Sequence, residues 1–365
     1  MSVRRALAAV TVFAAAGALV AAASARPTSA PTRPRVAIQP RLPLVVVTAE
    51  GEVSVVDPTG ARHVMAELDP PHEASLRAAT SPSGAVFLDV DRWVRGDVSF
   101  AGRLVIVRDG ARPLDLVDDV VHASTPLPLS DGRVLVSRGA PGPASDHAAR
   151  VDELRVDAVD PDTREVETIA TYSGYLLFLA GTLDSEVFLY RVGVEGADVV
   201  AVSLAPGHAV RQLAPVPPFG RDFSVDPIDR RLVYVNRSGS AWVTSAIDLE
   251  RGERQELASG DFMAMIPRAL PVVDARGHAE LLLTEDPARG PVLRSSAFGG
   301  VDLRLGPGSA HVADADAETG WIAGTVGPSG ARAHVFVANV RSGDVEAWPV
   351  PDRPTFVAGF LRGSK

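Results

Sequence analysis

Cysteine is absent from all 365 residues of the sequence. The chain can therefore form no disulfide, present no thiolate as a nucleophile or metal ligand, and carry no lipid on a cysteine. If the chain is exported, it has to be stable through its hydrophobic core alone. Serine and threonine remain as side-chain nucleophiles, but the Gly-x-Ser-x-Gly turn that exposes serine in many hydrolases does not occur.

Basic residues are scarce in most of the chain. Six of the 36 Lys and Arg residues precede residue 44, and none of the 45 acidic residues does. Residues 44–365 therefore hold 30 basic and 45 acidic residues, a net charge near −15. Because binding to nucleic acid requires clustered Lys and Arg side chains against the phosphates, we expect no nucleic-acid partner.

A long apolar run occurs only at the N-terminus. Two arginines in residues 1–5 precede the apolar segment Ala6–Ala23, and Ala23-Ser24-Ala25 has the small-residue pattern of a signal-peptide cleavage site. We predict a signal peptide over residues 1–25 and an exported protein, periplasmic or secreted, with no membrane span after cleavage. The alternative is an uncleaved anchor, because the run is almost long enough to cross a bilayer.

Residues 26–43 are rich in Pro, Ser, Thr and Arg and have no apolar periodicity. This composition is typical of a solvated linker, and contact of its arginines with an anionic surface is the alternative. We therefore expect one folded domain over residues 44–365.

After residue 43, apolar runs of helical period are missing. Short β-branched segments alternate with Gly, Asp and Pro, which predicts an all-β fold. Seven strand–turn–strand units recur, with turns near residues 58, 110, 161, 206, 250, 299 and 342. The intervals of 43 to 52 residues resemble those of propeller blades, which repeat every 40–50 residues or so.

Each of these hairpins follows another strand, and a short segment rich in Ala and Gly precedes most of those strands. Each unit therefore has four strands, which we name A to D in chain order. We predict a seven-bladed β-propeller of four-stranded antiparallel blades, with six or eight blades as alternatives.

The first and last units are complementary. The first unit begins at its strand B, at Pro43, and the last is followed by an additional segment, Pro354–Gly363. This segment is similar to the strand A segment YLLFLAGT, which begins at Tyr175. We expect it to fill the strand A position of the first blade and to close the ring.

Two stretches carry a family resemblance. TSPSGAVFLDVD, from Thr80, and FSVDPIDRRLVYVNRSGSAWVTSAIDLERGERQEL, from Phe223, resemble the TolB-like, WD40-like propeller repeat with its S-P-D-G and D-L-x-x-G turns. The resemblance covers about two units and implies a propeller, but it says little about a ligand. The Trp-Asp pair of WD40 repeats does not occur.

Loop length distinguishes the two faces of such a propeller. The B–C and D–A connections share one face and are the longer ones, so we call this the loop-rich face; ligands usually meet a propeller there. Arginines at or just before strands A, and two histidines in long loops, are our candidate ligand-binding residues at the channel mouth: Arg77, Arg221, Arg268, Arg353, His122 and His147.

Guanidinium groups in such a ring could hold a carboxylate or a phosphate through paired hydrogen bonds. The alternative is that they pair with neighbouring acids, such as Asp222 and Asp352, and that the histidines are solvated loop residues. The segment Asp314–Gly320 superficially resembles a calcium loop but lacks the bidentate glutamate. We predict no metal, no cofactor and no catalytic residue.

These observations favour a monomeric, exported binding or scaffold module that meets a protein, a peptide or an envelope component at the loop-rich face. The alternative is an exported enzyme, a lyase, glycosidase or lactonase, that uses acidic and histidine side chains around the channel mouth.

Overall fold

The computed structural model describes residues 41–362 with interruptions, all within one unit, Ile38–Lys365. The interruptions are residues 72–73, 92–101, 122–123, 140–151, 228, 240, 262–267, 272–279, 287–289, 296–300, 305–308, 317–318, 328–333, 341 and 350–354. Over 258–309 the description covers the backbone only. The described residues form strands and no helix, and so contain no helix that is long and apolar enough to cross a membrane.

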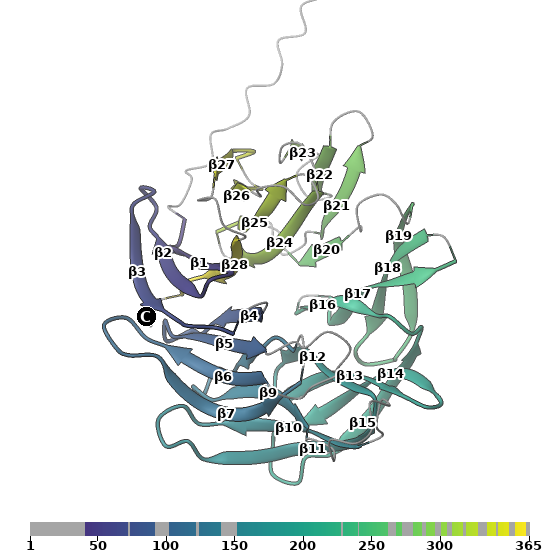
Figure 1. Ribbon diagram of the computed structural model, residues 1–365. Helices are drawn as coiled ribbons and strands as arrows, with labels where there is room; N and C mark the ends of the chain where they lie inside the picture. Colours follow the sequence, from purple (N-terminus) through teal and green to yellow (C-terminus); the bar gives the residue numbers. More distant parts are fainter. Residues whose placement is uncertain are drawn as a thin grey trace, which may run out of the picture. The chain divides into compact units, whose positions relative to one another are not determined.

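Five of the sheets have four antiparallel strands (Figure 1). The first joins the two ends of the described chain: β28 (Thr355–Phe360), β1 (Leu44–Thr48), β2 (Glu52–Val56) and β3 (Arg62–Glu67). A second sheet comprises β12 (Leu176–Leu183), β13 (Glu186–Gly193), β14 (Gly196–Ser203) and β15 (Val210–Val216). A third comprises β16 (Arg221–Asp226), β17 (Arg231–Ser238), β18 (Ala241–Asp248) and β19 (Arg254–Asp261). A fourth comprises β20 (Arg268–Pro271), β21 (Glu280–Asp286), β22 (Gly290–Ser295) and β23 (Val301–Arg304). A fifth comprises β24 (Ser309–Asp316), β25 (Trp321–Gly327), β26 (His334–Asn339) and β27 (Val345–Pro349).

One sheet differs from the prediction because it has eight strands. It contains two runs of four: β4 (Ser75–Thr80), β5 (Val86–Asp91), β6 (Gly102–Val107) and β7 (Leu114–Val120), and β8 (Leu127–Pro128), β9 (Val134–Gly139), β10 (Asp152–Val159) and β11 (Val166–Gly174). The sequence pattern predicts these as two separate units. They join where the end of β7 pairs with β9, through Val120 and Arg138.

Proline explains this join. Strand β8 has only two residues, and Pro126 and Pro128 cannot donate backbone hydrogen bonds, so β8 leaves most of the inner edge of β9 uncovered. The end of β7 takes that place, where the N–H of Val121 donates to the carbonyl of Ser137 over 2.9 Å.

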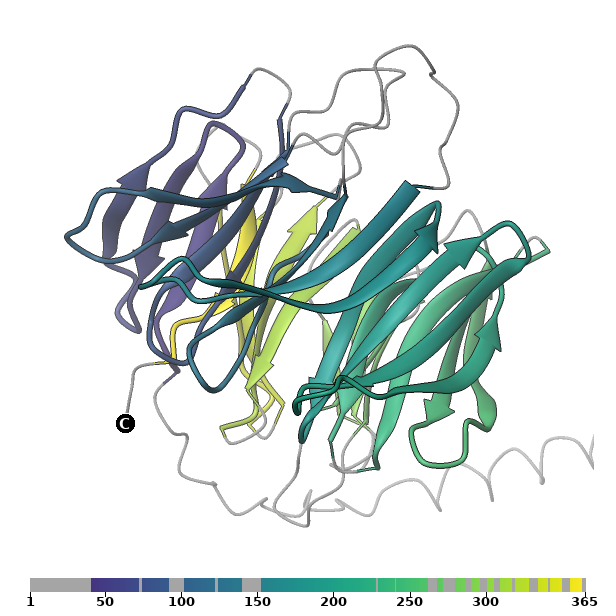
Figure 2. The same ribbon diagram turned by 90° about the horizontal axis from the view of Figure 1, so that it is seen from below.

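The sheets are arranged as a propeller. Strand β28 contacts β24 and β4, β4 contacts β8, and β16 contacts β12 and β20. Figure 1 shows β28, β4, β12, β16, β20 and β24 turned towards the middle of the unit, and β3, β11, β15, β19, β23 and β27 at its rim. Figure 2 shows the same sheets from below, with neighbouring sheets facing one another. The predicted all-β propeller architecture is confirmed.

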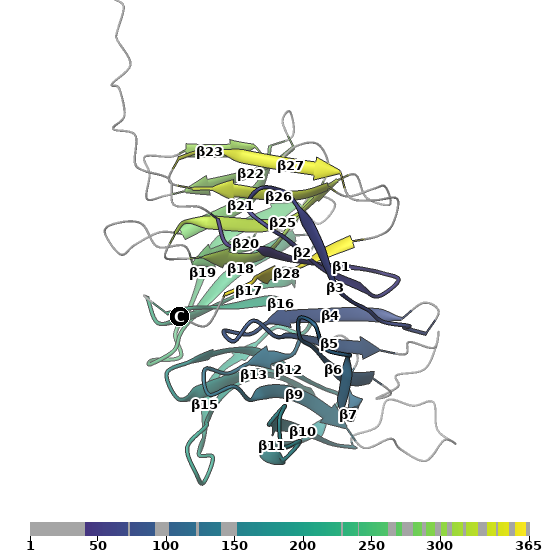
Figure 3. The same ribbon diagram turned by 90° about the vertical axis from the view of Figure 1, so that its left-hand side faces the viewer.

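The C-terminal strand lies in the first sheet, as predicted. Strand β28 pairs antiparallel with β1, so that Phe356 opposes Val47 (Figures 1 and 3). Beyond this ladder, the N–H of Phe360 donates to Asp314 Oδ2 over 2.9 Å, and Thr80 Oγ1 donates to the carbonyl of Phe360 over 2.9 Å. Because Asp314 belongs to β24 and Thr80 to β4, the C-terminal strand connects the last sheet with the sheet that follows β3.

The likeness between YLLFLAGT and the C-terminal segment has a structural cause. Gly181 and Gly359 occupy matching β-bulges with φ of 145° and 146°, a conformation that other residues rarely adopt. A Cβ atom on Gly181 would lie 2.5 Å from Cγ2 of Val225, on the neighbouring inner strand. Both glycines therefore allow adjacent inner strands to approach closely.

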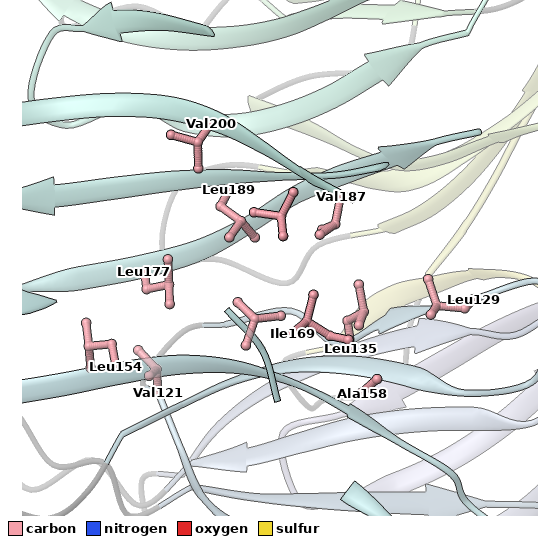
Figure 4. Packing of buried hydrophobic residues seen from close by; sticks show 12 residues of the cluster. Val121, Leu129, Leu135, Leu154, Ala158, Ile169, Leu177, Val187, Leu189 and Val200 are labelled. Carbon is pink, nitrogen blue, oxygen red and sulfur yellow. The ribbon is translucent and has the colours of Figure 1, made fainter. Parts of the chain in front are cut away.

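The hydrophobic core lies between neighbouring sheets. Figure 4 shows one cluster, in which Leu135 and Leu154 of the eight-stranded sheet face Leu177 and Leu189 of the next. All four side chains are buried. The Ser137 hydroxyl donates to the carbonyl of Leu177 at this boundary. Valine and leucine on both faces of the central strands thus bind the sheets to one another.

Candidate binding site on the loop-rich face

The structure describes the side chains of two of the six predicted binding residues. His122, His147 and Arg353 lie outside the described residues, and of Arg268 only the backbone is described, as the first residue of β20. For these four residues the binding role stays a prediction.

Arg77 lies on the inner strand β4, directly opposite Asp89 of β5. Its side chain is exposed, and Nη1 donates to the carbonyl of Leu76 over 3.2 Å. Asp89 is fully buried. Arg77 and Arg221 lie on strands that are not neighbours in the order of inner strands, so the described part of the structure does not bring them together.

Arg221 is the first residue of β16, at the position that the sequence predicts. Its Nε donates to Asp222 Oδ2 over 3.0 Å, which is the alternative that the sequence left open for this residue. Its guanidinium carbon also lies 5.8 Å from the ring centroid of Trp242, within the range of a cation–π contact. The Arg221 side chain is nevertheless 53% exposed.

A short loop carries an exposed aromatic residue two positions before Arg221. Residues 217–220, which read Pro-Pro-Phe-Gly, connect β15 to β16, and the side chain of Phe219 is 76% exposed. The backbone of Phe219 has φ of 69°, in the left-handed region that a bulky residue rarely adopts. A conformation of this kind persists only where the surroundings impose it.

Tyrosine 190 holds this loop. The N–H of Gly220 donates to the Tyr190 hydroxyl over 3.1 Å, and burial raises the pKa of that hydroxyl. The Tyr190 ring lies 4.9 Å from the ring of Phe223, and Phe223 stacks on Tyr234 at 5.6 Å. A Cβ atom on Gly220 would lie 3.0 Å from the ring of Phe223, so glycine suits this position. The loop is therefore anchored on a buried aromatic row at the boundary between two sheets.

A second apolar side chain extends from the same edge of the sheet. The strand register aligns one row across β12 to β15: Leu176, Val192, Ala197 and Val216. The β13–β14 turn and the β15–β16 loop both follow this row. Val194, at the tip of that turn, is 73% exposed.

Charged groups behind this edge are paired. Arg191 donates to both carboxylate oxygens of Asp198, over 2.9 and 2.7 Å. Burial alone would raise the pKa of Asp198, but the hydrogen bonds from Arg191 and Gln212 lower it overall. The Arg191 guanidinium also lies 4.9 Å from the ring centroid of Tyr172. These contacts stiffen the ends of β13 and β14.

The opposite face carries pairs of charged side chains that link either neighbouring sheets or the two runs of the eight-stranded sheet. His63 lies 2.9 Å from Asp109, Arg108 lies 2.6 Å from Asp162, and Arg230 lies 3.0 Å from Asp184. Exposed pairs such as these contribute little stability individually, about 0–1 kcal/mol. Except for His63, which lies in β3, the residues of these pairs lie in A–B and C–D turns.

The loop-rich edge over β13 to β18 combines exposed apolar side chains with a guanidinium group. Tryptophan, tyrosine and arginine are enriched among the residues that dominate protein interfaces, and exposed apolar groups gather at docking sites. Among the described residues, no group of three or more His, Asp or Glu side chains could hold a metal ion. The arrangement can thus bind a partner by apolar contact and by charge.

Sequence reasoning named Arg221 but missed Phe219, Val194 and Trp242. Residues 214–222, which read APVPPFGRD, include the proline-rich D–A connection before β16, so the location was visible in the sequence. The exposure of Phe219 was not visible in the sequence, because a phenylalanine between short strands could equally well belong to the hydrophobic core. The order Pro-Pro-Phe-Gly was the signal available in the sequence, because proline fixes the backbone φ where the chain enters a turn.

No protein-family model and no curated protein matches the sequence. Among solved structures, puromycin hydrolase matches with a TM-score of 0.55 at 14% identity, over 86% of this chain and 54% of that chain. A structure from a mechanistic analysis of two prolyl endopeptidases matches with a TM-score of 0.55 at 13% identity, over 85% of this chain and 50% of that chain. TolB from Acinetobacter baumannii matches with a TM-score of 0.46 at 12% identity, over 87% of this chain and 82% of that chain.

This chain thus spans about half the length of the first two proteins. TolB, whose repeat the sequence resembles over two units, is among the structural neighbours. At this level of identity the similarity shows the propeller fold alone.

Proposed function

We propose that the protein is an exported binding or scaffold module, which holds a protein, a peptide or an envelope component on its loop-rich face. The observation that carries this proposal is the side chain of Phe219, which is 76% exposed although its loop is anchored on the buried Tyr190. An anchored loop loses little conformational freedom on binding, so a larger share of its contact energy is left for affinity.

The blade count is part of this proposal. The eight-stranded sheet consists of two runs of four strands, joined at the end of β7, where Val120 pairs with Arg138 and the N–H of Val121 donates to the carbonyl of Ser137. Each run repeats the A-to-D order of the four-stranded sheets. We infer from this count that the ring has seven blades, one for each hairpin in the sequence.

Export is also a proposal, which rests on the predicted signal peptide over residues 1–25. Those residues lie outside the described part of the chain. Mass spectrometry of the protein purified from its native host tests this directly. We expect a mature N-terminus at Arg26, and a retained Met1 on a membrane-bound protein would support the anchor instead.

Site-specific photo-crosslinking tests the binding function. A photoreactive amino acid is introduced at Arg77 or Val194 on the loop-rich face, or at Thr59 in a turn of the opposite face, and cells are irradiated. We expect discrete cross-linked species from the first two positions and none from Thr59. Equal yields from both faces, or no adduct from any position, would contradict the proposed function.

The enzyme hypothesis drawn from the sequence, a lyase, glycosidase or lactonase, stays a prediction. The two histidines predicted as ligand-binding residues at the channel mouth, His122 and His147, lie outside the described residues.

A further inference from the structure

Three residues, one in the β15–β16 loop and two near strand ends of the next sheet, place apolar and basic side chains on the loop-rich face. Phe219 extends from the β15–β16 loop, Arg221 begins β16, and Trp242 lies near the start of β18. The guanidinium of Arg221 lies over the ring of Trp242 at 5.8 Å. Arg237 of β17 is the cross-strand partner of Trp242, so its exposed side chain leaves the same side of the sheet.

Trp242 is therefore flanked by two arginines. Both arginines are exposed and both are oriented by a neighbour, since Arg221 Nε donates to Asp222 and Arg237 Nε donates to the carbonyl of Gly239 over 3.1 Å. A guanidinium that already contacts a ring offers its remaining N–H groups in a fixed plane.

Arg221 retains hydrogen-bonding capacity. Its Nε donates to Asp222, while its two Nη groups make no hydrogen bond with another residue in the described ranges. Two Nη groups on a half-exposed, oriented guanidinium match the two oxygens of a carboxylate. The charge at this place is thus complementary to an acidic ligand.

The apolar part of the surface is held in a fixed position. Phe219 and Asp222 both have positive φ, 69° and 53°, and the loop between them is tied to Tyr190 through Gly220. The aromatic row beneath the loop maintains this strained backbone conformation. The conformation in turn keeps the Phe219 ring in solvent. A large apolar side chain of a partner could cover that ring.

We propose that the loop Pro217–Asp222, together with Trp242, is a docking site for an acidic peptide segment of a partner protein. One large apolar side chain of the segment packs on Phe219, and a carboxylate of the segment pairs with the Nη groups of Arg221. Arg237 attracts further acidic residues. The inference rests on the proposed binding function and names its partner class and its principal contacts.

The experiment selects ligands from random short peptides displayed on phage, with the purified full chain as bait. We expect the selected peptides to be enriched in Asp and Glu and to contain an aromatic or large aliphatic residue. A synthetic peptide of the selected consensus is then titrated against the protein variants by fluorescence anisotropy.

Phe219→Ser and Arg221→Gln are each expected to weaken this peptide about tenfold or more. The matched controls are Val210→Ser, which removes a side chain of 58% exposure from the outer strand β15, and Arg251→Gln in the β18–β19 turn. Both controls should bind as the wild type does. Circular dichroism checks that all four variants fold.

Selection of basic or uncharged peptides, or affinities that survive both Phe219→Ser and Arg221→Gln, would overturn this docking site. If the surviving affinity is lost on substitution of Arg77 instead, the proposed binding function stands while this inference fails. If the bait selects no peptide and photo-crosslinking yields no adduct, both fail.

Discussion

Aspartate residues that begin the C–D turns show how one side chain shapes a repeated element. Asp57, Asp160 and Asp248 each accept hydrogen bonds from backbone N–H groups within their own turn. At Asp248 the N–H groups of Arg251 and Glu250 lower the pKa of the carboxyl, in that order of effect. Turns of this kind favour Asp because its carboxylate mimics a backbone acceptor.

These turns predict an acid-sensitive contribution to stability. The folded-state pKa of Asp248 lies below its unfolded value of about 3.9, so the folded protein favours the ionised form. The contribution is fully present above that value and is lost as the pH falls through the lower folded pKa. Denaturant titrations between about pH 5 and about pH 2 should show a shallower loss of unfolding free energy in Asp248→Ala than in the wild type. Identical pH profiles would contradict this.

Gly359 provides a second prediction, because a comparable glycine lacks its neighbours. A Cβ atom at Gly359 would lie 2.9 Å from Thr80 Oγ1 and 3.0 Å from Asp314 Oδ2, whereas one at Gly196 would meet nothing within 4 Å. The two glycines have similar φ, 146° and 138°. Gly359→Ala should therefore lower the unfolding free energy by about 1–3 kcal/mol more than Gly196→Ala. Equal losses in urea denaturation would mean that the inner strands do not pack closely.

At the scale of strands, the sequence predicted most of the elements and their order. Alternating β-branched residues bounded by Gly, Asp and Pro indicate strands such as β5, β13 and β17. The join of β7 to β9 was not predicted, because it depends on a neighbouring element. A short, proline-rich β8 is visible in the sequence, but what covers the edge beside it is not.

A buried ion pair consolidates that join. Arg138 Nη1 donates to Asp157 over 2.9 Å, and Arg138 Nε donates to the carbonyl of Asp118 over 2.7 Å. The Asp157 side chain is only 1% exposed, with Arg155 Nε at 3.4 Å and the Thr168 hydroxyl donating over 2.9 Å. Removal of Arg138 would leave a buried carboxylate with incomplete compensation.

Arg138→Met should therefore lower the unfolding free energy by about 3 kcal/mol or more. Arg103→Met is the matched control in the same sheet, because its partner Asp115 is 56% exposed, and it should cost less than about 1 kcal/mol. The double variant Arg138→Met/Asp157→Leu should recover part of the loss, since no charge is then buried alone. Additive losses in urea denaturation would contradict the role of this pair.

The conformation of the loop at Phe219 could not be predicted from the sequence, for a similar reason. The loop is held by a hydrogen bond that the hydroxyl of Tyr190, on a strand of the preceding sheet, accepts from the N–H of Gly220. Local preference at Phe219 would have predicted negative φ. Propensities describe residues near in sequence, whereas this backbone is set by packing between two sheets.

At the scale of the whole propeller, closure by β28 decides whether the sheets form a ring. The segment that closes it was predicted from its likeness to another inner strand and from the missing first strand of the first unit. Its contacts extend further than the ladder with β1, because Arg362 Nη2 also donates to Asp314 over 2.9 Å. Phe360, which is fully buried, adds an apolar contact to the last sheet.

Removal of residues 354–365 therefore tests the central claim, that the C-terminal strand closes the ring and holds the sheets in place. The melting temperature of the truncated protein is compared with that of the full chain, without and with a synthetic peptide of the removed sequence. We expect a large decrease or loss of cooperative unfolding, partly restored by the peptide. An unchanged melting temperature would contradict closure by β28.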